Sequence, residues 1–389
     1  MDGRISRRNR RFSAGEVAGK TSLTVLWLVF LAPLFYQAIV IAVCIRQSLR
    51  KKRETRLPVP VSILKPIRGL DPEMASALRS QAAQNYPEFE ILFGVGDPDD
   101  PAIGVIEELQ REFPNVAMTL HIGASAAQNA KVGILINLAQ HARNPVWVVN
   151  DSDIRVTPDY LSRITAPLED AGTGVVTCLY RASSHSAASW WEALGVAIDF
   201  MPSTLVAPLV GVKEFGLGST LCFRKVDLLA AGGFEALADY IADDYQVARS
   251  IVRLGKRAHL SECVVETSLG DATWSGAWKH QLRWARTIKT SKGAGFAGLP
   301  ITHAGVWAIV ALALHWWTGA ALLIGFRAAA ALASGWLAMR LRRNPLVALL
   351  APLWDLYAFA VWLWSYTSND VEWRGRQLRI LPDGKLEPR

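Results

Sequence analysis

Cysteine is scarce in this sequence, and residues that build structural metal sites are not clustered. Among 389 residues there are only four cysteines, which lie far apart, and no two of them form a Cys-x-x-Cys pair. No histidine pair has the close spacing of a metal site either. We therefore expect neither a zinc centre nor a disulfide framework, and we expect a reducing compartment.

Acidic residues are in deficit, and the chain is too apolar for a soluble enzyme of its size. Lysine plus arginine total 42 against 34 aspartate plus glutamate, while 51% of the residues are hydrophobic and 15 are tryptophan. The basic excess is clustered beside apolar runs, which indicates an anionic membrane surface, and no nucleic acid, as the partner. The length allows one sizeable domain plus membrane segments, or two ordinary domains, and the charge content is too high for a pure transporter.

The first apolar run predicts a membrane anchor near the N-terminus. Residues 1–20 are polar and basic and are expected to form a disordered tail. Residues 21–45 follow without a charged side chain, which is long enough to cross a bilayer and too long for the core of a signal peptide. Because the basic residues that come next face the body of the protein, we place them in the cytoplasm.

Residues 57–295 alternate between expected strands and helices. Three helix starts carry a capping residue followed by proline, at Asp71-Pro72, Asp100-Pro101 and Thr157-Pro158. Strands are expected at residues 59–64, 89–95, 116–122, 146–149 and 175–180, with later ones at 216–223 and 258–268. This alternation predicts an α/β domain with a parallel sheet and helices on both faces.

Two further segments of this region predict contact with the membrane. Residues 187–212 form a long apolar run that is either a core helix or a helix in the membrane interface, and we favour the interface. Residues 274–289 combine apolar residues at helical spacing with lysine, arginine and histidine. A basic amphipathic helix of this kind is typical of an anionic membrane surface, although an ordinary surface helix has the same pattern.

The C-terminal region, residues 301–367, is again largely apolar. Residues 304–326 and 345–366 are each long enough to cross a bilayer, and the shorter piece at 327–343 is a candidate return leg. We therefore expect three or four crossings in the whole chain. The last residues, 368–389, are expected to form a polar tail.

A buried strand that ends in carboxylates is the first indication of chemistry. Residues 146–149 are apolar, and the chain then turns polar at Asn150, Asp151 and Asp153. The carboxyl ends of parallel strands are where open α/β sheets bind ligands, and two neighbouring carboxylates need a cation. Mg²⁺ or Mn²⁺ bound together with a diphosphate would satisfy them. The alternative is a solvated turn, because aspartate and serine are also common in turns.

Five segments in order along the chain resemble the membrane-bound glycosyltransferases of families 2 and 21. They read VSILKPIRGLDP, GVGDPDDPAI, NDSDIRVTPDYL, ADDYQVARSIVRLG and KHQLRWARTIK, and they span residues 61–289. The likeness is greatest to ceramide glucosyltransferase and the bacterial hopanoid glycosyltransferases. It implies the GT-A fold of nucleotide-diphospho-sugar transferases, a Rossmann-like and mostly parallel sheet, anchored by transmembrane helices at both ends.

The resemblance also implies roles for individual residues. Lys65, Asp97 and Asp151 would bind the nucleotide sugar, Asp97 through its uracil or ribose. Asp153, helped by Asp151, would hold Mg²⁺ or Mn²⁺ on the diphosphate. Asp244 would be the general base. The simpler alternatives are that Asp97 is only a loop residue and that Asp244 is only a charged residue at a helix start.

The last matching segment concerns the acceptor. Arg283 and Trp284 match the end of the family's Gln/Arg-x-x-Arg-Trp motif, which contacts the diphosphate and shapes the acceptor site. The first position of that motif is His280 here, a departure that leaves the role of this residue open. Trp284 is alternatively an interfacial anchor.

Together these features predict an inverting transferase that moves one sugar, glucose or N-acetylglucosamine, from a UDP-sugar to the hydroxyl of a membrane lipid. The lipid would be a ceramide or a hopanoid, and the product a β-glycolipid. A metal and an arginine would stabilise charge on the leaving diphosphate while a carboxylate takes the hydroxyl proton. We expect the catalytic domain on the cytoplasmic face of the inner membrane. The alternatives are a processive polysaccharide synthase, for which the crossings are few, and a non-enzymatic membrane scaffold or transporter.

Overall fold

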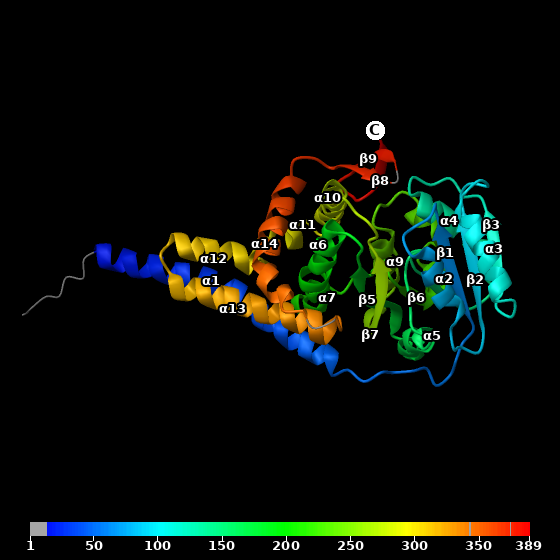
Figure 1. Ribbon diagram of the computed structural model, residues 1–389, viewed down its shortest axis with the longest axis horizontal. Helices are drawn as coiled ribbons and strands as arrows, with labels where there is room; N and C mark the ends of the chain where they lie inside the picture. The colour runs from blue at the N-terminus through cyan, green and yellow to red at the C-terminus, as the bar shows by residue number, and fades with distance from the viewer. Residues whose placement is uncertain (1–13, 342–343, 374) are drawn as a thin grey trace, which may run out of the picture.

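The computed structural model describes residues 14–341, 344–373 and 375–389, so most of the predicted basic tail lies outside the described residues. A sheet domain forms one end of the molecule, and long apolar helices project from the other (Figure 1). The chain begins in helix α1 (Ala14–Ser48), builds the sheet domain, returns to the apolar helices and ends in a small second sheet.

The large sheet is mostly parallel, as the alternating pattern predicts. Its strand order is β3-β2-β1-β4-β6-β5-β7, and β6 runs antiparallel to its neighbours β4 and β5. Every residue of β1 and of β4 is buried because helices cover the centre of the sheet on both faces. The strands are β1 (Val61–Ile67), β2 (Phe89–Val95), β3 (Ala117–Ile122), β4 (Val146–Val149), β5 (Thr173–Ser183), β6 (Leu221–Arg224) and β7 (Arg257–Ser268).

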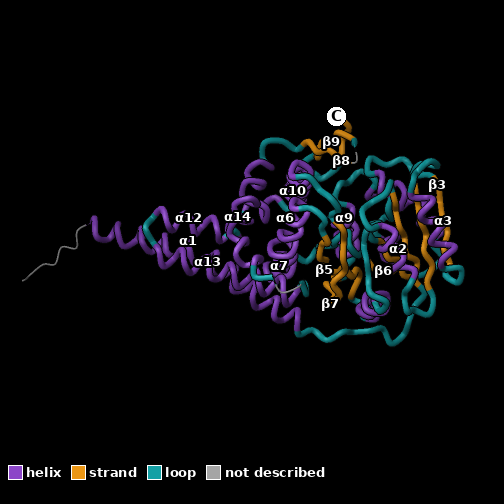
Figure 2. The backbone as a smooth tube through the Cα atoms, in the orientation of Figure 1, coloured by secondary structure: helices purple, strands orange, loops and turns teal. Residues whose placement is uncertain are grey.

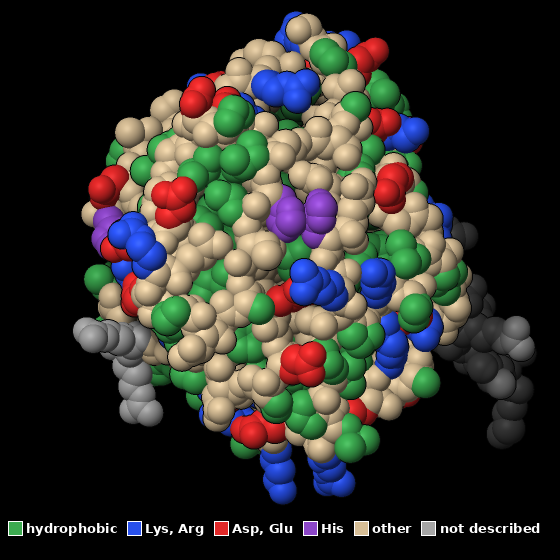
Figure 3. Space-filling model, turned by 90° about the vertical axis from the view of Figure 1, so that its right-hand side faces the viewer, with side chains coloured by type: hydrophobic (Ala, Val, Ile, Leu, Met, Phe, Trp, Pro, Cys, Tyr) green, Lys and Arg blue, Asp and Glu red, His purple; other side chains and the backbone are tan. Residues whose placement is uncertain are grey.

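The helices of the sheet domain lie against these strands (Figure 2). They are α2 (Met74–Ala82), α3 (Ala102–Glu112), α4 (Ala130–His141), α5 (Tyr160–Thr165), α8 (Lys225–Ala230) and α9 (Asp243–Val252), with short 3₁₀ turns η1 (Ala166–Glu169) and η4 (Glu235–Leu237). Asp100 caps α3 as expected, since its Oδ1 accepts a 2.9 Å hydrogen bond from the backbone N–H of Ala102. The face of this domain away from the apolar helices carries intermixed acidic, basic and apolar side chains, as expected of a face in water (Figure 3).

Several expected elements of the sheet domain begin later than predicted. Helix α5 starts at Tyr160 after Asp159 and is not capped by Thr157, and β1 starts at Val61 and not at residue 59. Helix α2 starts at Met74 and not at Asp71-Pro72, because Glu73 adopts a left-handed backbone conformation with φ 58°. The carboxylate of Asp71 accepts a hydrogen bond from the Ser152 hydroxyl instead of capping the helix. The strand expected at residues 216–223 is β6, which starts at Leu221, and the residues before it form a turn. The displaced starts of α2 and β6 both lie beside the loop after β4 that carries Asp151 and Asp153, which we call the acidic loop.

The expected single crossing at residues 304–326 is wrong. The chain reverses at His315, whose φ is 56°, so that α12 (Ala304–Ala313) and α13 (Trp317–Leu332) form a helical hairpin. Helix α13 continues into the π-helix η6 (Ala333–Ala338), and α14 (Leu346–Ser365) follows. Within the described residues, four helices are long and apolar enough to cross a membrane: Phe30–Ser48, Ala187–Val210, Trp317–Ala338 and Leu346–Ser365. Positions 342 and 343 of the predicted return leg lie outside the described residues.

The apolar run after β5 joins the sheet domain to the long apolar helices. It comprises α6 (Ala187–Gly195), the π-helix η2 (Val196–Phe200), α7 (Met201–Val206) and the 3₁₀ turn η3 (Ala207–Val210). This run packs against β5 on one side and against α1 and α13 on the other. Arg327, expected at the end of a crossing, is buried inside α13, where it pairs with Asp355 at 2.8 Å and donates a 3.1 Å hydrogen bond to the Ile198 carbonyl. The run is thus packed as a core helix over part of its surface, and its place relative to a lipid surface stays a prediction.

The C-terminal residues do more than form a polar tail. After the apolar helices the chain returns over α10 (Trp274–Ser291) and forms β8 (Asp370–Trp373), β9 (Arg376–Ile380) and β10 (Leu386–Pro388), an antiparallel sheet of order β10-β9-β8 (Figure 2). Between α10 and α12 lie α11 (Gly293–Ala297) and the 3₁₀ turn η5 (Leu299–Thr302). The small sheet packs against α10 and the residues before α9, so the C-terminus lies against the sheet domain.

Candidate functional site

A cavity of about 630 Å³ opens at the carboxyl ends of the central strands. One wall is formed by the end of β1, the start of α4, the acidic loop after β4 and the start of α9. The opposite wall is formed by α10 and the apolar run after β5. The cavity therefore combines a polar wall at the sheet edge with a wall formed by helices that pack against the long apolar helices.

Lys65 supports the acidic loop through hydrogen bonds from inside the domain. Its Nζ donates 2.7 Å hydrogen bonds to Oδ1 of Asn150 and to the carbonyl of Asp151. Lys65 has no solvent exposure, and burial lowers its pKa to about 7. It does not line the cavity, so this structure does not support the predicted direct contact with a nucleotide sugar. Lys65 is the third residue from the end of β1, and every residue of this strand is buried, so the side chain points into the domain.

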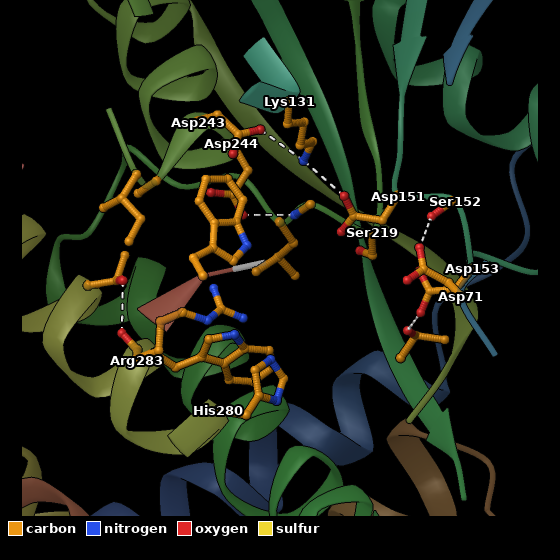
Figure 4. A pocket seen from close by; sticks show the side chains of 18 of the residues that line it. Asp71, Lys131, Asp151, Ser152, Asp153, Ser219, Asp243, Asp244, His280 and Arg283 are labelled. Atoms are coloured by element: carbon orange, nitrogen blue, oxygen red, sulfur yellow. Dashed lines mark hydrogen bonds and ion pairs between the residues drawn. The ribbon is translucent and has the colours of Figure 1, made fainter. Parts of the chain in front are cut away.

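Lys131 connects two carboxylates across the polar wall (Figure 4). Its Nζ lies 2.9 Å from Oδ1 of Asp151 and 2.9 Å from Oδ2 of Asp243. Burial alone would lower the pKa of Lys131, but the two carboxylates outweigh it and raise the pKa above its ordinary value. Lys131 is thus a fixed positive charge between the loop after β4 and the start of α9. The side chain of Asn129, which accepts hydrogen bonds from the backbone N–H groups of Lys131 and Val132, starts the helix that presents it.

Asp153 and Asp71 lie beside Asp151 at the other end of the acidic loop. Oδ2 of Asp153 accepts hydrogen bonds from the Thr267 hydroxyl and, at 3.3 Å, from the backbone N–H of Ser268. Burial raises the pKa of Asp153 to about 6, and the negative charges of Asp151 and Asp71 add to this rise. Three carboxylates therefore lie close together at this loop, and their negative charges act on one another.

The donors at this loop fit a hard divalent cation that arrives with phosphate oxygens. They are carboxylate oxygens only, which suit Mg²⁺ or Mn²⁺, and their neighbouring negative charges favour a cation. Among the described residues no three acidic, histidine or cysteine side chains already surround one point as ligands. Mg²⁺ is usually bound by one or two carboxylates plus substrate phosphates, so two aspartates with a diphosphate are a sufficient set.

Asp244 lies in the first turn of α9, close to the same loop. Its Oδ2 accepts a 2.8 Å hydrogen bond from the backbone N–H of Gly218, and its Oδ1 accepts one of 2.7 Å from that of Tyr245. Burial and the neighbouring Asp243 raise the pKa of Asp244 to about 6. The turn before β6 requires glycine at position 218, because a Cβ atom there would lie 2.9 Å from Oδ2 of Asp151. The site thus holds a carboxylate of raised pKa with a fixed orientation.

Helix α10 brings His280, Arg283 and Trp284 to the opposite wall (Figure 4). The ring of Trp284 packs against Phe200, with centroids 5.3 Å apart, and against His280 at 4.7 Å. His280 is hydrogen-bonded through Nδ1 to the carboxylate of Glu192, which is only 2% exposed and accepts a second, 2.9 Å hydrogen bond from the Gln281 amide. His280 therefore ties α10 to α6 at the cavity wall.

The structure brings together six of the eight predicted site residues. Asp151, Asp153, Asp244, His280, Arg283 and Trp284 line the cavity, whereas Lys65 and Asp97 do not. Asp97 is exposed on the loop after β2, where its Oδ1 accepts a 3.0 Å hydrogen bond from the backbone N–H of Asp99. Its contact with uracil or ribose stays a prediction.

Several cavity residues were not singled out by the sequence analysis. They are Asp71, Lys131, Glu192, Trp373 and Arg376. A buried glutamate in an apolar helix is a recognisable signal, and Glu192 is one of the two charged residues in its run. Lys131, Trp373 and Arg376 had no comparable local signal.

Comparison with known proteins adds a family to this geometry. The family model "Glycosyl transferase family 21" matches residues 25–386. Ceramide glucosyltransferase 1 of Caenorhabditis elegans is 30% identical over 258 residues, which cover 64% of this chain and 53% of that protein. Ceramide glucosyltransferase 3 of the same organism is 23% identical over 295 residues, covering 71% of this chain and 61% of that protein. The chain spans about half to three fifths of the length of these curated relatives.

A solved structure is similar in fold. The mannosyltransferase PcManGT from Pyrobaculum calidifontis, in complex with GDP-Man and Mn²⁺, aligns with a TM-score of 0.54 and 20% identity over 89% of this chain and 96% of that chain. At this identity the likeness shows the fold alone, a GT-A-like α/β fold, which confirms the fold class expected from the sequence. Because the family model matches nearly the whole sequence, the chain belongs to glycosyl transferase family 21.

Proposed function

We propose that this chain is an inverting glycosyltransferase that moves one sugar, glucose or N-acetylglucosamine, from a UDP-sugar to the hydroxyl of a membrane lipid. The lipid would be a ceramide or another sphingolipid, or a hopanoid, and the product a β-glycolipid. The observation that carries the proposal is the composition of one cavity, with carboxylates and Lys131 on one wall and the rings of Trp284 and Phe200 on the other. A polar donor and an apolar acceptor could meet there, beside helices apolar enough to cross a membrane.

The polar wall would bind the donor diphosphate. Asp151 and Asp153 would hold Mg²⁺ or Mn²⁺, with the remaining oxygen ligands provided by the diphosphate. When bound, the cation would stabilise negative charge on the departing nucleoside diphosphate. Arg283 lies on the facing wall of the same cavity and would add a second positive charge.

The nucleoside would extend along the sheet edge toward Asp97. Ile67 lines the cavity and pairs with Val95 of β2, two residues before Asp97. An exposed carboxylate at this position can accept hydrogen bonds from uracil or ribose. Lys65 would act without touching the donor, by holding Asn150 and the backbone of Asp151.

Asp244 would take the proton of the acceptor hydroxyl. A carboxylate with a pKa of about 6 is mostly ionised at neutral pH and is a stronger base than an ordinary aspartate. Two backbone N–H groups hold it in one orientation, so it is ready for a hydroxyl that enters past Trp284. Attack on the face opposite the leaving diphosphate would invert the anomeric carbon and convert an α-linked donor into a β-linked product.

The proposal extends to the placement of the protein. Residues 57–295 would form the catalytic domain on the cytoplasmic face of the inner membrane, with 21–45 and 301–367 as membrane regions. The C-terminal sheet packs against the catalytic domain, which supports a C-terminus on the same side of the membrane.

Mass spectrometry of lipid products tests the proposal. The purified chain in lipid nanodiscs would be incubated with Mn²⁺, each of UDP-glucose, UDP-galactose and UDP-N-acetylglucosamine, and either a ceramide or a hopanoid with a free hydroxyl. We expect one lipid class to gain the mass of a single sugar, and the Asp244→Asn variant to form this product far more slowly. A ladder of added sugars would instead indicate a polysaccharide synthase, and absence of product in every combination would contradict the proposal.

A further inference from the structure

The small C-terminal sheet has one apolar face and one charged face. Strand pairing places Val371 opposite Leu378 and Trp373 opposite Arg376, and alternation along the strands puts all four on one face. Asp370, Glu372, Gln377 and Arg379 lie on the other face, where Arg379 pairs with Asp370 at 2.9 Å. Among the described residues of the apolar face, Arg376 is the one with a charged side chain.

The apolar face covers the segment that leads to Asp244. Val371 and Leu378 are at most 4% exposed and pack with Ile241 and Ala242. The backbone N–H of Ile241 donates a 3.2 Å hydrogen bond to the carbonyl of Gly384, and that of Leu386 donates one of 2.7 Å to the carbonyl of Asp239. The end of the chain is therefore joined by its backbone to the residues just before Asp243 and Asp244.

Trp373 and Arg376 lie where this face passes from packed core to open cavity. Both line the cavity, and Arg376 is exposed. Its Nη1 lies 3.4 Å from the carbonyl of Gln128, one residue before the cap of α4 and three before Lys131. Arg376 thus lies near the start of α4, the helix that presents Lys131, while the small sheet that carries both side chains also packs against α10.

A guanidinium and an indole that open side by side into a polar cavity are suited to a sugar. A guanidinium offers several N–H donors in a rigid plane to neighbouring hydroxyl oxygens, and an indole covers the C–H face of a pyranose while keeping an N–H donor. Arg376 donates one hydrogen bond, from Nη1 to the Gln128 carbonyl, and it forms no ion pair with a carboxylate of the described residues, so its other N–H groups can bind a ligand. Lys131 and the aspartates of this cavity are assigned to the diphosphate. We therefore assign Trp373 and Arg376 to the sugar end of a nucleotide-sugar site.

We propose that Trp373 and Arg376 of the C-terminal sheet bind the transferred sugar of the donor and contribute to the choice of sugar. The inference rests on the proposed function, because it requires a nucleotide sugar in this cavity. It adds that the donor site is completed by residues that follow the last membrane helix. The catalytic domain in isolation lacks this wall.

Equilibrium binding to the full-length chain in nanodiscs tests this inference without relying on turnover. Dissociation constants for UDP and for the UDP-sugar used in transfer would be measured on the wild type and on Arg376→Ala, Arg376→Lys and Trp373→Ala. Arg376→Ala is expected to weaken UDP-sugar binding about tenfold or more, the loss of a charged hydrogen bond, while UDP binding changes little. Arg376→Lys should recover part of the loss. Arg379→Ala, on the opposite face of the same strand, is the matched control and should bind both ligands as the wild type does.

The outcomes separate this inference from the proposed function. Equal UDP-sugar binding by the wild type and Arg376→Ala would overturn the inference and leave the proposed function standing. An equal loss for UDP and UDP-sugar would also overturn it, because the contact would then be to the nucleotide. A wild-type chain that binds neither ligand would overturn both. A fall in melting temperature shared by Arg376→Ala and Arg379→Ala, without selective loss of UDP-sugar binding, would show a structural role only.

Discussion

The backbone N–H of Gly218 donates a 2.8 Å hydrogen bond to the carboxylate of Asp244. The carbonyl of Gly218 accepts a 3.2 Å hydrogen bond from the backbone N–H of Asp151. One residue without a side chain thus connects the proposed base to the proposed metal-binding loop. The backbone of Gly218 thus fixes the Asp244 carboxylate relative to the backbone of Asp151, as a site that must align a donor and an acceptor requires.

Replacing Gly218 by alanine should impair transfer. A Cβ atom at this position would lie 2.9 Å from Oδ2 of Asp151, which is too close, so the carboxylate or the turn must shift. We expect kcat to fall about tenfold to hundredfold, because displacements of about 1 Å at reacting groups have effects of this size. Gly104→Ala is the matched control, since a Cβ atom there meets nothing within 4 Å and the residue lies in α3. Wild-type kinetics for Gly218→Ala would show that the turn does not position Asp151.

The pH dependence of transfer should report the base. The pKa of Asp244 is raised to about 6, so its carboxylate is ionised above this pH and protonated below it. We therefore expect kcat/KM to fall about tenfold per pH unit as the pH drops below about 6. Asp244→Asn should lose about 10²- to 10⁴-fold in rate at neutral pH, whereas Asp239→Asn, an exposed residue in the preceding segment, should not. An acid limb near pH 4, the ordinary range of aspartate, would contradict the assigned environment.

Removing the charge of Lys131 should move that acid limb upward. The ammonium of Lys131 lowers the pKa of Asp244, and it also neutralises Asp151 and Asp243 at 2.9 Å. In Lys131→Met this favourable charge is lost while the repulsion from Asp243 and Asp151 remains, so Asp244 holds its proton to a higher pH. The pH profile of kcat/KM for the variant should show an apparent pKa above that of the wild type. Lys279→Met, a surface lysine paired with Glu372, is the control, and a downward shift in Lys131→Met would refute the interpretation.

The ion pair between Arg327 and Asp355 should stabilise the contact between the long apolar helices and the apolar run after β5. Both residues are at most 3% exposed, and Arg327 also binds the Ile198 carbonyl, so α13, α14 and η2 meet there. Arg327→Met leaves a buried carboxylate without its partner and should lower the free energy of unfolding by about 3–5 kcal/mol. The double variant Arg327→Met/Asp355→Leu should regain part of this loss, measured by thermal unfolding in detergent. A double variant less stable than the single one would contradict the argument.

Local sequence signals were sufficient for much of the sheet domain. Apolar strands separated by capped helices predicted the mostly parallel sheet, and the carboxyl end of β4 predicted that Asp151 and Asp153 would lie at its edge. Asp244, Arg283 and Trp284 came to the same cavity because each lies on an element whose type and position the pattern indicated. Features that local periodicity determines were therefore predictable.

Features that depend on distant parts of the chain were not predictable. The reversal at His315 occurs inside a continuous apolar run, where composition does not mark a turn and a left-handed residue ends α12. Lys65 points from its strand into the core, where it supports the acidic loop of a neighbouring strand. Arg376 reaches the cavity only after the chain has passed through the long apolar helices and returned. In each case the decisive contact is tertiary.

The metal dependence of UDP binding tests the central claim, that the carboxylates after β4 bind a divalent cation together with a diphosphate. UDP would be titrated into the wild-type chain and Asp153→Asn in nanodiscs, each with Mn²⁺ and with a chelator. The account predicts that Mn²⁺ tightens UDP binding at least about tenfold in the wild type and has little effect in Asp153→Asn. Equal UDP affinity of the wild type with Mn²⁺ and with the chelator would contradict it.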